Sequence, residues 1–400
     1  MAVSGLLVRS PHNPLITGAD IPLPGGAACV FNSGATLHDG EIVMLVNLWD
    51  REWIPRFLVG RSRDGIHFDI DPRNRVEPPK EYPYVPHEGI FDTRITTLEG
   101  WHYITYNVAS RLGGRIMLAR TRDFTAIETL GFITGPDHRN CVIFPEKING
   151  LYARLERPNV DDSGDIYLSY SPDLMYWGRT TLVLERNHRY WESAKIGPGA
   201  PPVKTEAGWL CLYHGCRQSM NGFSYHAGAV LLDLADPSRI VGKCNQCLLA
   251  PEQSYETNGK CPNVVFPTAA LRHGAAEELK IYYGAADSAM CLATAGFRNW
   301  CMPAWRAGRR DGGRSILLRS EVWQNSMAAV FPSQRDGTEI GRGFSPCVSP
   351  PHHFACRQVR GESRRTYGTP SFHFSEQGLK PLPIVVQSLR DEATPNQLEC

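Results

Sequence analysis

Short apolar runs separated by turn residues are the dominant pattern of the chain up to about residue 297. Each run is four to eight residues long, rich in Val, Ile, Tyr or Leu, and bounded by Gly, Pro, Asp or Asn. The runs cover residues 42–48, 102–108, 115–119, 166–170, 209–213, 229–234 and 279–283. Long amphipathic helical windows are scarce, and 37 Gly and 30 Pro supply frequent turns. This pattern predicts an all-β protein.

An internal repeat refines that prediction. The octapeptide that begins at Arg61 (Arg-Ser-Arg-Asp-Gly-Ile-His-Phe) resembles those that begin at Arg120 and Tyr170. Each follows an expected strand and contains an Asp that can cap a tight turn. The aligned residues, Asp64, Asp123, Asp173 and Asp236, are 50 to 63 residues apart. This spacing fits one four-stranded blade of a β-propeller, and about 290 residues give about five blades. A β-sandwich with similar hairpins is the alternative.

The pattern changes near residue 297. Residues 301–400 contain twelve Arg and one Lys, and runs such as 306–314 and 345–353 mix Arg, Gly, Pro, Ser and Cys without a period. We therefore expect a propeller domain over residues 1–297 and an atypical Arg/Pro/Ser-rich tail of low order over residues 298–400. A tail outside the folded domain, including an out-of-frame extension of the gene, is favoured over one that binds nucleic acid.

Composition and charge narrow the class of protein. The 400 residues are 42% hydrophobic and 21% charged, as in soluble globular proteins. A formal net charge of +1 excludes a strong preference of the whole protein for nucleic acid or anionic membrane, but leaves room for a local basic pocket. No apolar stretch reaches the roughly 18 residues of a membrane span. The first 14 residues lack a secretory-signal pattern, so we expect a cytoplasmic protein.

The twelve cysteines are scattered, and most lie inside apolar runs, as Cys29, Cys211 and Cys291 do. This is typical of reduced core cysteines. Cys244 and Cys247 form a lone CxxC, and a zinc site needs a second ligand pair at metal spacing, which the sequence does not offer. We therefore expect no metal.

Three segments combine acids or bases with turn residues. Asp92 precedes an expected strand, and Arg94 lies on the same face of an extended segment. Cleavage of a glycosidic bond needs a carboxyl acid to protonate the leaving oxygen, and Asp92 is a candidate for that role. A structural ion pair or a turn cap is the alternative. The other segments carry basic residues around 138–158 and 191–214, and a solvated basic face is the alternative there.

Five short sequence blocks lie, in this order, between residues 13 and 297. They are Phe144-Pro-Glu-Lys-Ile-Asn-Gly, Lys195-Ile-Gly-Pro-Gly-Ala-Pro-Pro-Val-Lys-Thr-Glu, Trp209-Leu-Cys-Leu-Tyr-His-Gly, Pro262-Asn-Val-Val-Phe-Pro-Thr and Ile281-Tyr-Tyr-Gly-Ala-Ala-Asp. In content and order they resemble the signature blocks of glycoside hydrolase family 130, which contains β-mannoside phosphorylases and some β-mannosidases. The resemblance implies a five-bladed propeller and inverting phosphorolysis of terminal β-1,4-mannosides, with release of α-mannose 1-phosphate.

The resemblance also implies roles for single residues. Asp92 corresponds to the family's catalytic Asp, which is proposed to protonate the glycosidic oxygen through the 3-hydroxyl of the bound mannose. Thr93 replaces the Pro that usually follows this Asp, which affects the local turn. The family's phosphate cluster is matched by four residues that we expect to act as cations, Arg139, Arg157, Lys195 and His214. This cluster favours phosphorolysis over hydrolysis, since a hydrolase of the family lacks the full set.

On the sugar side, the resemblance matches Asn32, Ser33 and Asp287 to polar residues near the mannosyl subsite. Arg94 is expected to hold substrate by pointing toward sugar hydroxyls, because a cation beside the acid would lower the pKa of that acid. Tyr255 and Glu256 are either site residues or packing residues. Two further aromatic candidates, Trp49 and Trp53, either stack on an acceptor sugar or cover a blade edge.

Inorganic phosphate is implied as co-substrate, with no metal or organic cofactor. The implied partners are a small mannoside and phosphate, without nucleic acid or membrane, and the oligomeric state stays open. The substrate is expected to be a mannosyl-glucose, a manno-oligosaccharide or a mannosyl-N-acetylglucosamine, and the acceptor sugar and the β-1,4 or β-1,2 linkage stay open. The alternatives are a β-mannosidase that uses water, and an inactive carbohydrate-binding propeller whose ring a lost last strand leaves open.

Overall fold

Five antiparallel sheets make up the part of the chain that the computed structural model describes, which is residues 6–76, 89–111, 113–159, 164–188, 190–273 and 278–296. The first blade contains β3 (Ala27–Val30), β4 (Gly34–His38), β5 (Glu41–Asp50), β6 (Pro55–Ser62) and β7 (Asp69–Val76). The second blade contains β8 (Ile90–Leu98), β9 (Trp101–Val108), β10 (Arg115–Thr121) and β11 (Glu128–Phe132). The third blade contains β12 (His138–Ile143), β13 (Tyr152–Pro158), β14 (Ile166–Ser171) and β15 (Gly178–Leu184). The fourth blade contains β16 (Lys195–Pro198), β17 (Val203–Thr205), β18 (Gly208–Ser219), β19 (Gly222–Leu232) and β20 (Ile240–Lys243). The fifth blade contains β21 (Val265–Arg272), β22 (Glu278–Ala285) and β23 (Ala289–Gly296), together with the N-terminal β1 (Val8–Arg9) and β2 (Ile16–Thr17). The helical elements are the short η1 (Gly18–Asp20) and α1 (Ser254–Thr257).

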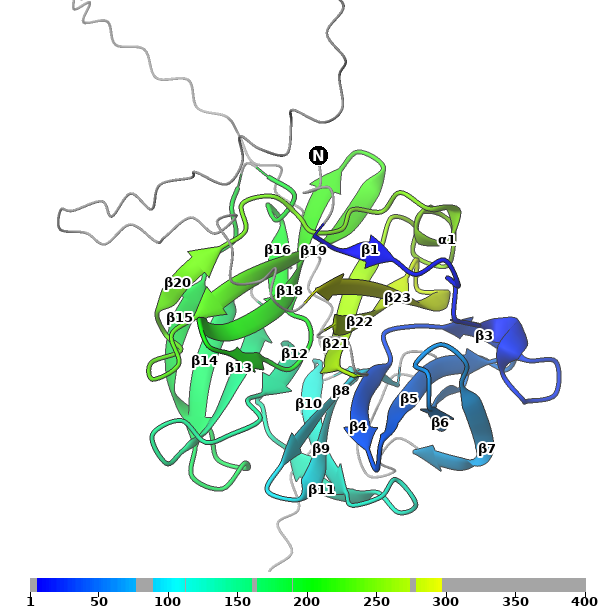
Figure 1. Ribbon diagram of the computed structural model, residues 1–400, viewed down its shortest axis with the longest axis horizontal. Helices are drawn as coiled ribbons and strands as arrows, with labels where there is room; N and C mark the ends of the chain where they lie inside the picture. Colours follow the sequence, from blue (N-terminus) through cyan, green and yellow to red (C-terminus); the bar gives the residue numbers. More distant parts are fainter. Residues whose placement is uncertain are drawn as a thin grey trace, which may run out of the picture. The chain divides into compact units, whose positions relative to one another are not determined.

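The sheets form a ring around a common centre, so the predicted five-bladed β-propeller is confirmed (Figure 1). Neighbouring blades touch through their central strands, since β4 contacts β8, β8 contacts β12, and β12 contacts β16. The ring is completed by contacts of β21 with β18 on one side and with β4 on the other. Every predicted strand lies in a blade, although β19 ends at Leu232, two residues before the predicted end.

The N-terminal strands close this ring. Val8 of β1 pairs with Thr294, and Ile16 of β2 pairs with Met290, so β1 and β2 lie along the outer edge of β23. The alternative in which a lost last strand leaves the ring open is therefore wrong, because the closing strands come from the start of the chain. The predicted tail, residues 298–400, lies outside the described residues.

An aspartate caps the same turn in four blades. The aligned Asp64, Asp123 and Asp173 do so as the repeat predicted, but in the fourth blade Asp233, and not the aligned Asp236, accepts the equivalent backbone N–H groups. Asp64 Oδ1 accepts the backbone N–H groups of Ile66 and His67 between β6 and β7. Asp173 does the same for Met175 and Tyr176 between β14 and β15. The fifth blade takes its outermost strand from the N-terminus, so it has no such turn and the repeat stops at four.

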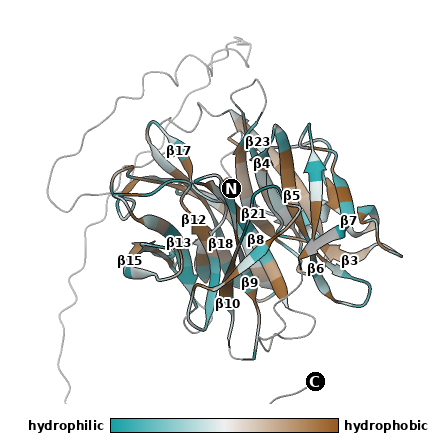
Figure 2. Ribbon diagram, turned by 90° about the horizontal axis from the view of Figure 1, so that it is seen from below, coloured by the Kyte–Doolittle hydropathy of each residue, from teal (hydrophilic) through white to brown (hydrophobic). Residues whose placement is uncertain are grey.

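Five hydrophobic layers, one between each pair of neighbouring blades, hold the ring together. Strand β5 shows how one strand serves two layers. Val43 and Leu45 pack toward the second blade, whereas Met44 and Val46 pack toward the fifth. Alternate side chains of a strand point to opposite faces, so a strand that is buried on both faces has a continuous run of apolar residues. Strand β5 is such a strand, and it is mostly brown, the colour of hydrophobic residues, in Figure 2.

The described cysteines behave as predicted. Cys29, Cys211 and Cys291 are buried free thiols, as are Cys244 and Cys247 of the CxxC. Within the described ranges no cluster of three or more His, Cys, Asp or Glu has the arrangement of a metal site. In the same part of the chain no helix has the length and apolar character needed to cross a membrane.

Candidate active site

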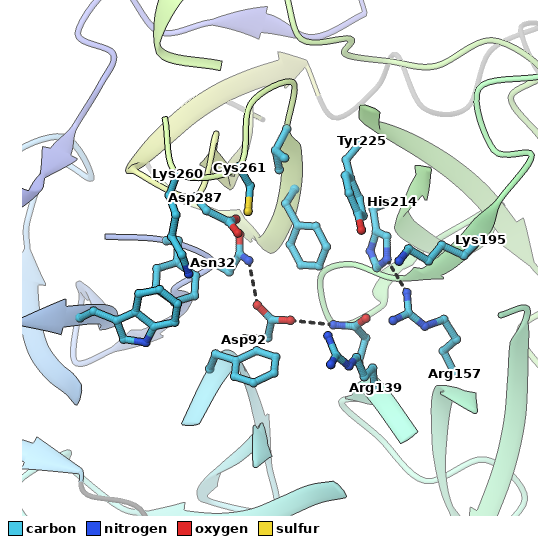
Figure 3. A pocket seen from close by; sticks show the side chains of 16 residues that line it. Asn32, Asp92, Arg139, Arg157, Lys195, His214, Tyr225, Lys260, Cys261 and Asp287 are labelled. Carbon is cyan, nitrogen blue, oxygen red and sulfur yellow. Dashed lines mark hydrogen bonds between the residues drawn. The ribbon is translucent and has the colours of Figure 1, made fainter. Parts of the chain in front are cut away.

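A pocket of about 300 Å³ opens at the centre of the ring, and every blade contributes to its wall (Figure 3). Its lining residues, in chain order, are Phe31, Asn32, Trp49, Phe91, Asp92, Arg139, Asn140, Arg157, Lys195, His214, Tyr225, Lys260, Cys261, Val264, Phe266 and Asp287. The predicted acid and all four residues of the predicted phosphate cluster are therefore brought together, although they come from three different blades.

A repeated backbone feature turns the polar side chains inward. Asn32, Asp92 and Asn140 lie on or beside the innermost strands of the first three blades, with φ of 44°, 59° and 55°. These left-handed values are unusual for residues with a side chain, but Asn and Asp adopt them more readily than others. At Asp92 and Asn140 the strand register also shifts, as in a β-bulge, which re-aims a side chain.

Three asparagines hold the carboxylate of Asp92. Asn32 Nδ2 donates to Oδ1 at 2.8 Å. Asn107 Nδ2 and Asn140 Nδ2 donate to Oδ2 at 3.0 and 3.1 Å. The carboxylate is thus bonded to residues of three blades while it faces the pocket. Buried side chains that are held in this way have one orientation, which proton transfer to a bound molecule requires.

In Figure 3, Arg157, Lys195 and His214 lie together on the side of the pocket away from Asn32 and Asp287, and Arg139 lies nearer to Asp92. Arg157 is buried, and the burial lowers its pKa to about 10, so the guanidinium stays charged at neutral pH. Its Nη1 donates to His214 Nε2 at 3.0 Å, and the His214 ring stacks on Phe266 at 4.3 Å between centroids.

His214 is neutral, which corrects the description of the cluster as four cations. Burial holds the pKa of His214 well below its ordinary value, and the charges of Arg157, Arg94 and Lys195 lower it further. Because Nε2 accepts from Arg157, the imidazole proton is on Nδ1. The cluster is therefore three cations and one imidazole, and the imidazole orients Arg157 by accepting its hydrogen bond.

A second group lies beside Asn32. Lys260 Nζ is 2.9 Å from the ring centroid of Trp49 and 5.6 Å from that of Phe31, which places a cation on an aromatic wall. Asp287, in the turn between β22 and β23, completes this side. Burial raises the pKa of Asp287 to about 6, the charge of Asp92 adds to the rise, and Lys260 opposes it.

Other sequence candidates lie outside the pocket wall. Ser33 is fully buried, and its Oγ accepts the Asn47 backbone N–H at 2.9 Å. Arg94 is also buried. It donates Nε–H to the Gly199 carbonyl and Nη1–H to the Thr93 carbonyl. Neither side chain lines the pocket, so the contact with substrate that the resemblance implied for both does not fit their placement.

The remaining candidates divide between wall and packing. Glu256 is fully buried and bonded to Arg9 and Tyr283, so its packing interpretation holds. Trp49 lines the pocket, and the exposed Trp53 lies outside it with its ring 5.5 Å from that of Trp49.

The sequence reasoning missed Lys260, Asn107 and Asn140 as site residues. The sequence did contain a signal for Asn107. In the first two blades a Phe is followed by Asn or Asp (Asn32, Asp92), and an Asn (Asn47, Asn107) follows 15 residues later. Phe91 is opposite Asn107 in the strand register, and the Phe31 N–H bonds to the Asn47 carbonyl.

The raised pKa of Asp287 predicts a pH-dependent effect on stability. A carboxyl group whose pKa is higher in the folded than in the unfolded state binds its proton more tightly in the folded protein, which stabilises the fold. This contribution is fully present below the pKa of the unfolded state, near 3.9, and is lost as the pH rises through the pKa of the folded state, about 6. We therefore expect Asp287→Asn to increase the free energy of unfolding by roughly 1–2 kcal/mol at pH 8 and to change it little at pH 4. Denaturant titrations at both pH values measure this. Asp39→Asn, at a side chain that is 90% exposed, is the control, and an equal effect of Asp287→Asn at both pH values would contradict the expectation.

Comparisons with known proteins agree with this architecture. A family model described as beta-1,4-mannooligosaccharide phosphorylase, of glycoside hydrolase family 130, matches residues 11–301. A beta-1,4-mannooligosaccharide phosphorylase of Ruminococcus albus is 35% identical over 296 residues, which are 71% of this chain and 87% of that protein. A beta-1,2-mannobiose phosphorylase of Listeria innocua is 37% identical over 234 residues, 58% of this chain and 64% of that protein. The solved structure of a Listeria innocua beta-1,2-mannobiose phosphorylase in complex with beta-1,2-mannobiose has a TM-score of 0.67 at 28% identity, covering 73% of this chain and 97% of that one.

Proposed function

The chain belongs to glycoside hydrolase family 130, and from this premise we propose that it is an enzyme that cleaves terminal β-mannosides with inorganic phosphate. The observation that carries the proposal is the pocket itself. A buried carboxylate held by three amides lies in one pocket of about 300 Å³ with three cations.

The cation cluster is suited to a phosphate dianion. Arg139 and Arg157 offer forked guanidinium donors, and Lys195 offers a compact charge. The neutral His214 accepts a hydrogen bond from Arg157 at Nε2 and so orients that guanidinium within the cluster. Such a pocket binds phosphate next to the anomeric carbon, whereas the cations do not attract neutral water in the same way. This supports phosphorolysis over hydrolysis.

In the proposed reaction, a phosphate oxygen forms a bond to the anomeric carbon from the side opposite the leaving group. The bond between that carbon and the glycosidic oxygen breaks. Asp92 gives its proton to the 3-hydroxyl oxygen of the mannose, and that hydroxyl gives its own proton to the leaving oxygen. The products are α-mannose 1-phosphate and the free acceptor, and Asp92 is left as a carboxylate held by its three amide donors.

The sugar is proposed to lie between the two groups of charges. Asn32 and Asp287 are placed to contact the mannosyl unit, and the wall of Trp49 and Lys260 is placed to contact the acceptor. We propose the β-1,4 linkage, because the matching family model and the Ruminococcus albus relative are both described by it. The closed ring and complete pocket support an active enzyme over a binding propeller.

Phosphate dependence tests the proposed function. The full chain is incubated with β-1,4-mannobiose or with β-1,2-mannobiose, each with and without phosphate, and products are followed by phosphorus NMR. We expect α-mannose 1-phosphate from the β-1,4 substrate with phosphate and no cleavage without it. Free mannose released at the same rate without phosphate would reject phosphorolysis in favour of hydrolysis. A strong preference for the β-1,2 substrate would reject the linkage alone.

Removing Lys195 tests the phosphate side of the site within the same assay. Lys195→Ala is expected to raise the KM for phosphate by roughly 10–100-fold, the equivalent of one hydrogen bond to a charged group. The KM for the mannoside should change by less than about threefold. Lys204→Ala is the matched control, because Lys204 pairs with Glu146 at the surface and is not in the pocket wall. An unchanged KM for phosphate in Lys195→Ala would contradict the assignment.

A further inference from the structure

Asn107 lies behind the pocket wall, yet it bonds to the carboxylate in that wall. It is 1% exposed and belongs to β9, the second strand of its blade. Its Nδ2 donates to Asp92 Oδ2 at 3.0 Å, and its Oδ1 accepts the backbone N–H of Asn140 at 3.3 Å. One side chain thus ties the carboxylate of the second blade to the innermost strand of the third.

The two oxygens of Asp92 are not equivalent. Oδ2 accepts two amide donors, from Asn107 and Asn140, whereas Oδ1 accepts one, from Asn32 (Figure 3 shows the bonds from the two wall residues). A carboxylate oxygen has two lone pairs that can accept hydrogen bonds. Both lone pairs of Oδ2 are therefore occupied, and Oδ1 keeps one that is open to a proton.

We propose that Asn107 is a positioning residue that closes Oδ2 to protonation and thereby makes Oδ1 the oxygen of Asp92 that exchanges a proton with substrate. The part of this inference that concerns turnover rests on the proposed function. The part that concerns the protonation of Asp92 stands on the hydrogen bonds alone. Asn107 touches no substrate, because it does not line the pocket.

Other charged groups also act on Asp92 and stay constant when Asn107 is changed. They are Arg94 on the same strand, Arg157 on β13 and Asp287 in the turn after β22. A shift of the Asp92 titration midpoint on substitution of Asn107 is therefore caused by the lost amide hydrogen bond, because these three charged neighbours are the same in both proteins.

The first blade offers a matched control. Asn47 occupies on β5 the position that Asn107 occupies on β9, and it is 0% exposed. Its side-chain oxygen and nitrogen have no hydrogen-bond partner within the part of the chain that the structure describes. Asn47→Leu therefore repeats the change of a buried Asn to an apolar residue without removing a bond to Asp92.

The experiment compares the full-length wild type, Asn107→Leu, Asn107→Asp and Asn47→Leu. The carboxyl carbon of Asp92, labelled with carbon-13 and identified by its loss in Asp92→Asn, is titrated by NMR. We expect the midpoint to rise by about one pH unit in Asn107→Leu, because a hydrogen bond to the charged form is lost. Asn107→Asp should move it in the same direction, because a neighbouring carboxylate disfavours the second charge. Asn47→Leu should leave it within about 0.2 unit of the wild type.

The kinetic arm measures the same variants with β-1,4-mannobiose and phosphate. We expect Asn107→Leu to lower kcat by roughly 10–100-fold with the KM for phosphate nearly unchanged, because orientation at the acid is lost while the cation cluster is intact. The limb of the pH profile at which activity falls with rising pH should move upward with the NMR midpoint. A midpoint unmoved in both folded Asn107 variants would overturn the inference. An absence of phosphate-dependent turnover in the wild type would instead reject the proposed function, and the NMR midpoint would still decide the role of Asn107.

Discussion

Replacing Asp92 with asparagine is expected to reduce phosphorolysis of β-1,4-mannobiose by at least about 1,000-fold, while binding of the mannoside remains measurable. The amide is nearly the same size as the carboxyl group, so the pocket keeps its shape. It has no proton to transfer at neutral pH, and the proposed mechanism assigns proton donation to the 3-hydroxyl of the sugar to Asp92. Calorimetric titration with mannobiose in the absence of phosphate separates binding from turnover.

The surroundings of Asp92 add a second effect to this variant. Asn32, Asn107 and Asn140 all donate to the carboxylate, so the new amide NH2 must face at least one donor that has lost its acceptor. We expect a loss of about 1–2 kcal/mol in the free energy of unfolding, which leaves the protein folded at 25 °C. Asp173→Asn, at a turn cap between β14 and β15, is the control and should retain activity. More than about a tenth of wild-type activity in Asp92→Asn would contradict its assignment as the acid.

Arg9→Met is expected to lower the free energy of unfolding by about 3 kcal/mol, the largest stability effect predicted here. Arg9 holds Glu256 through two bonds, from Nε at 2.8 Å and from Nη2 at 3.0 Å. Glu256 is fully buried, so its charge has no access to water once Arg9 is lost. The pair also links β1, which closes the ring, to α1, which precedes the pocket residues Lys260 and Cys261.

Two comparisons make this prediction specific. The double variant Arg9→Met with Glu256→Gln removes the unpaired charge and should recover part of the loss, which a denaturant titration measures. Arg63→Met breaks the exposed ion pair with Glu41 and should cost less than about 1 kcal/mol. If Arg9→Met costs no more than Arg63→Met, the buried pair does not hold the closing strand.

Much of the fold was predictable because its determinants are local. All five blades are built from short strands that are apolar on both faces, four of them also have a tight turn capped by Asp, and each of these features is encoded by residues that are near one another in the chain. The run at 42–48 and the cap at Asp64 are examples. Closure of the ring was not predictable in this way, because the pairing of β1 and β2 with β23 joins segments that are about 280 residues apart.

The site residues were predicted from the resemblance to the family, which matched residues both inside and outside the five blocks. The placement of Asp92, Arg139, Arg157, Lys195 and His214 around one pocket agrees with that expectation, and their roles stay predictions until the variants are measured. The resemblance carried no information on which neighbours contact each side chain. Ser33 and Arg94 were therefore expected at the substrate, although their side chains bond to backbone groups behind the wall.

The sequence was enough to indicate the propeller, because strand period and turn capping depend on near neighbours in the chain. Its resemblance to a known family indicated the acid and the basic residues of the site. The tertiary structure alone decided that His214 is neutral, that Lys260 lies on Trp49, and that Asn107 occupies one oxygen of Asp92. The physical reason is that charge, burial and hydrogen-bond saturation depend on groups from other blades, which meet only when the ring is closed.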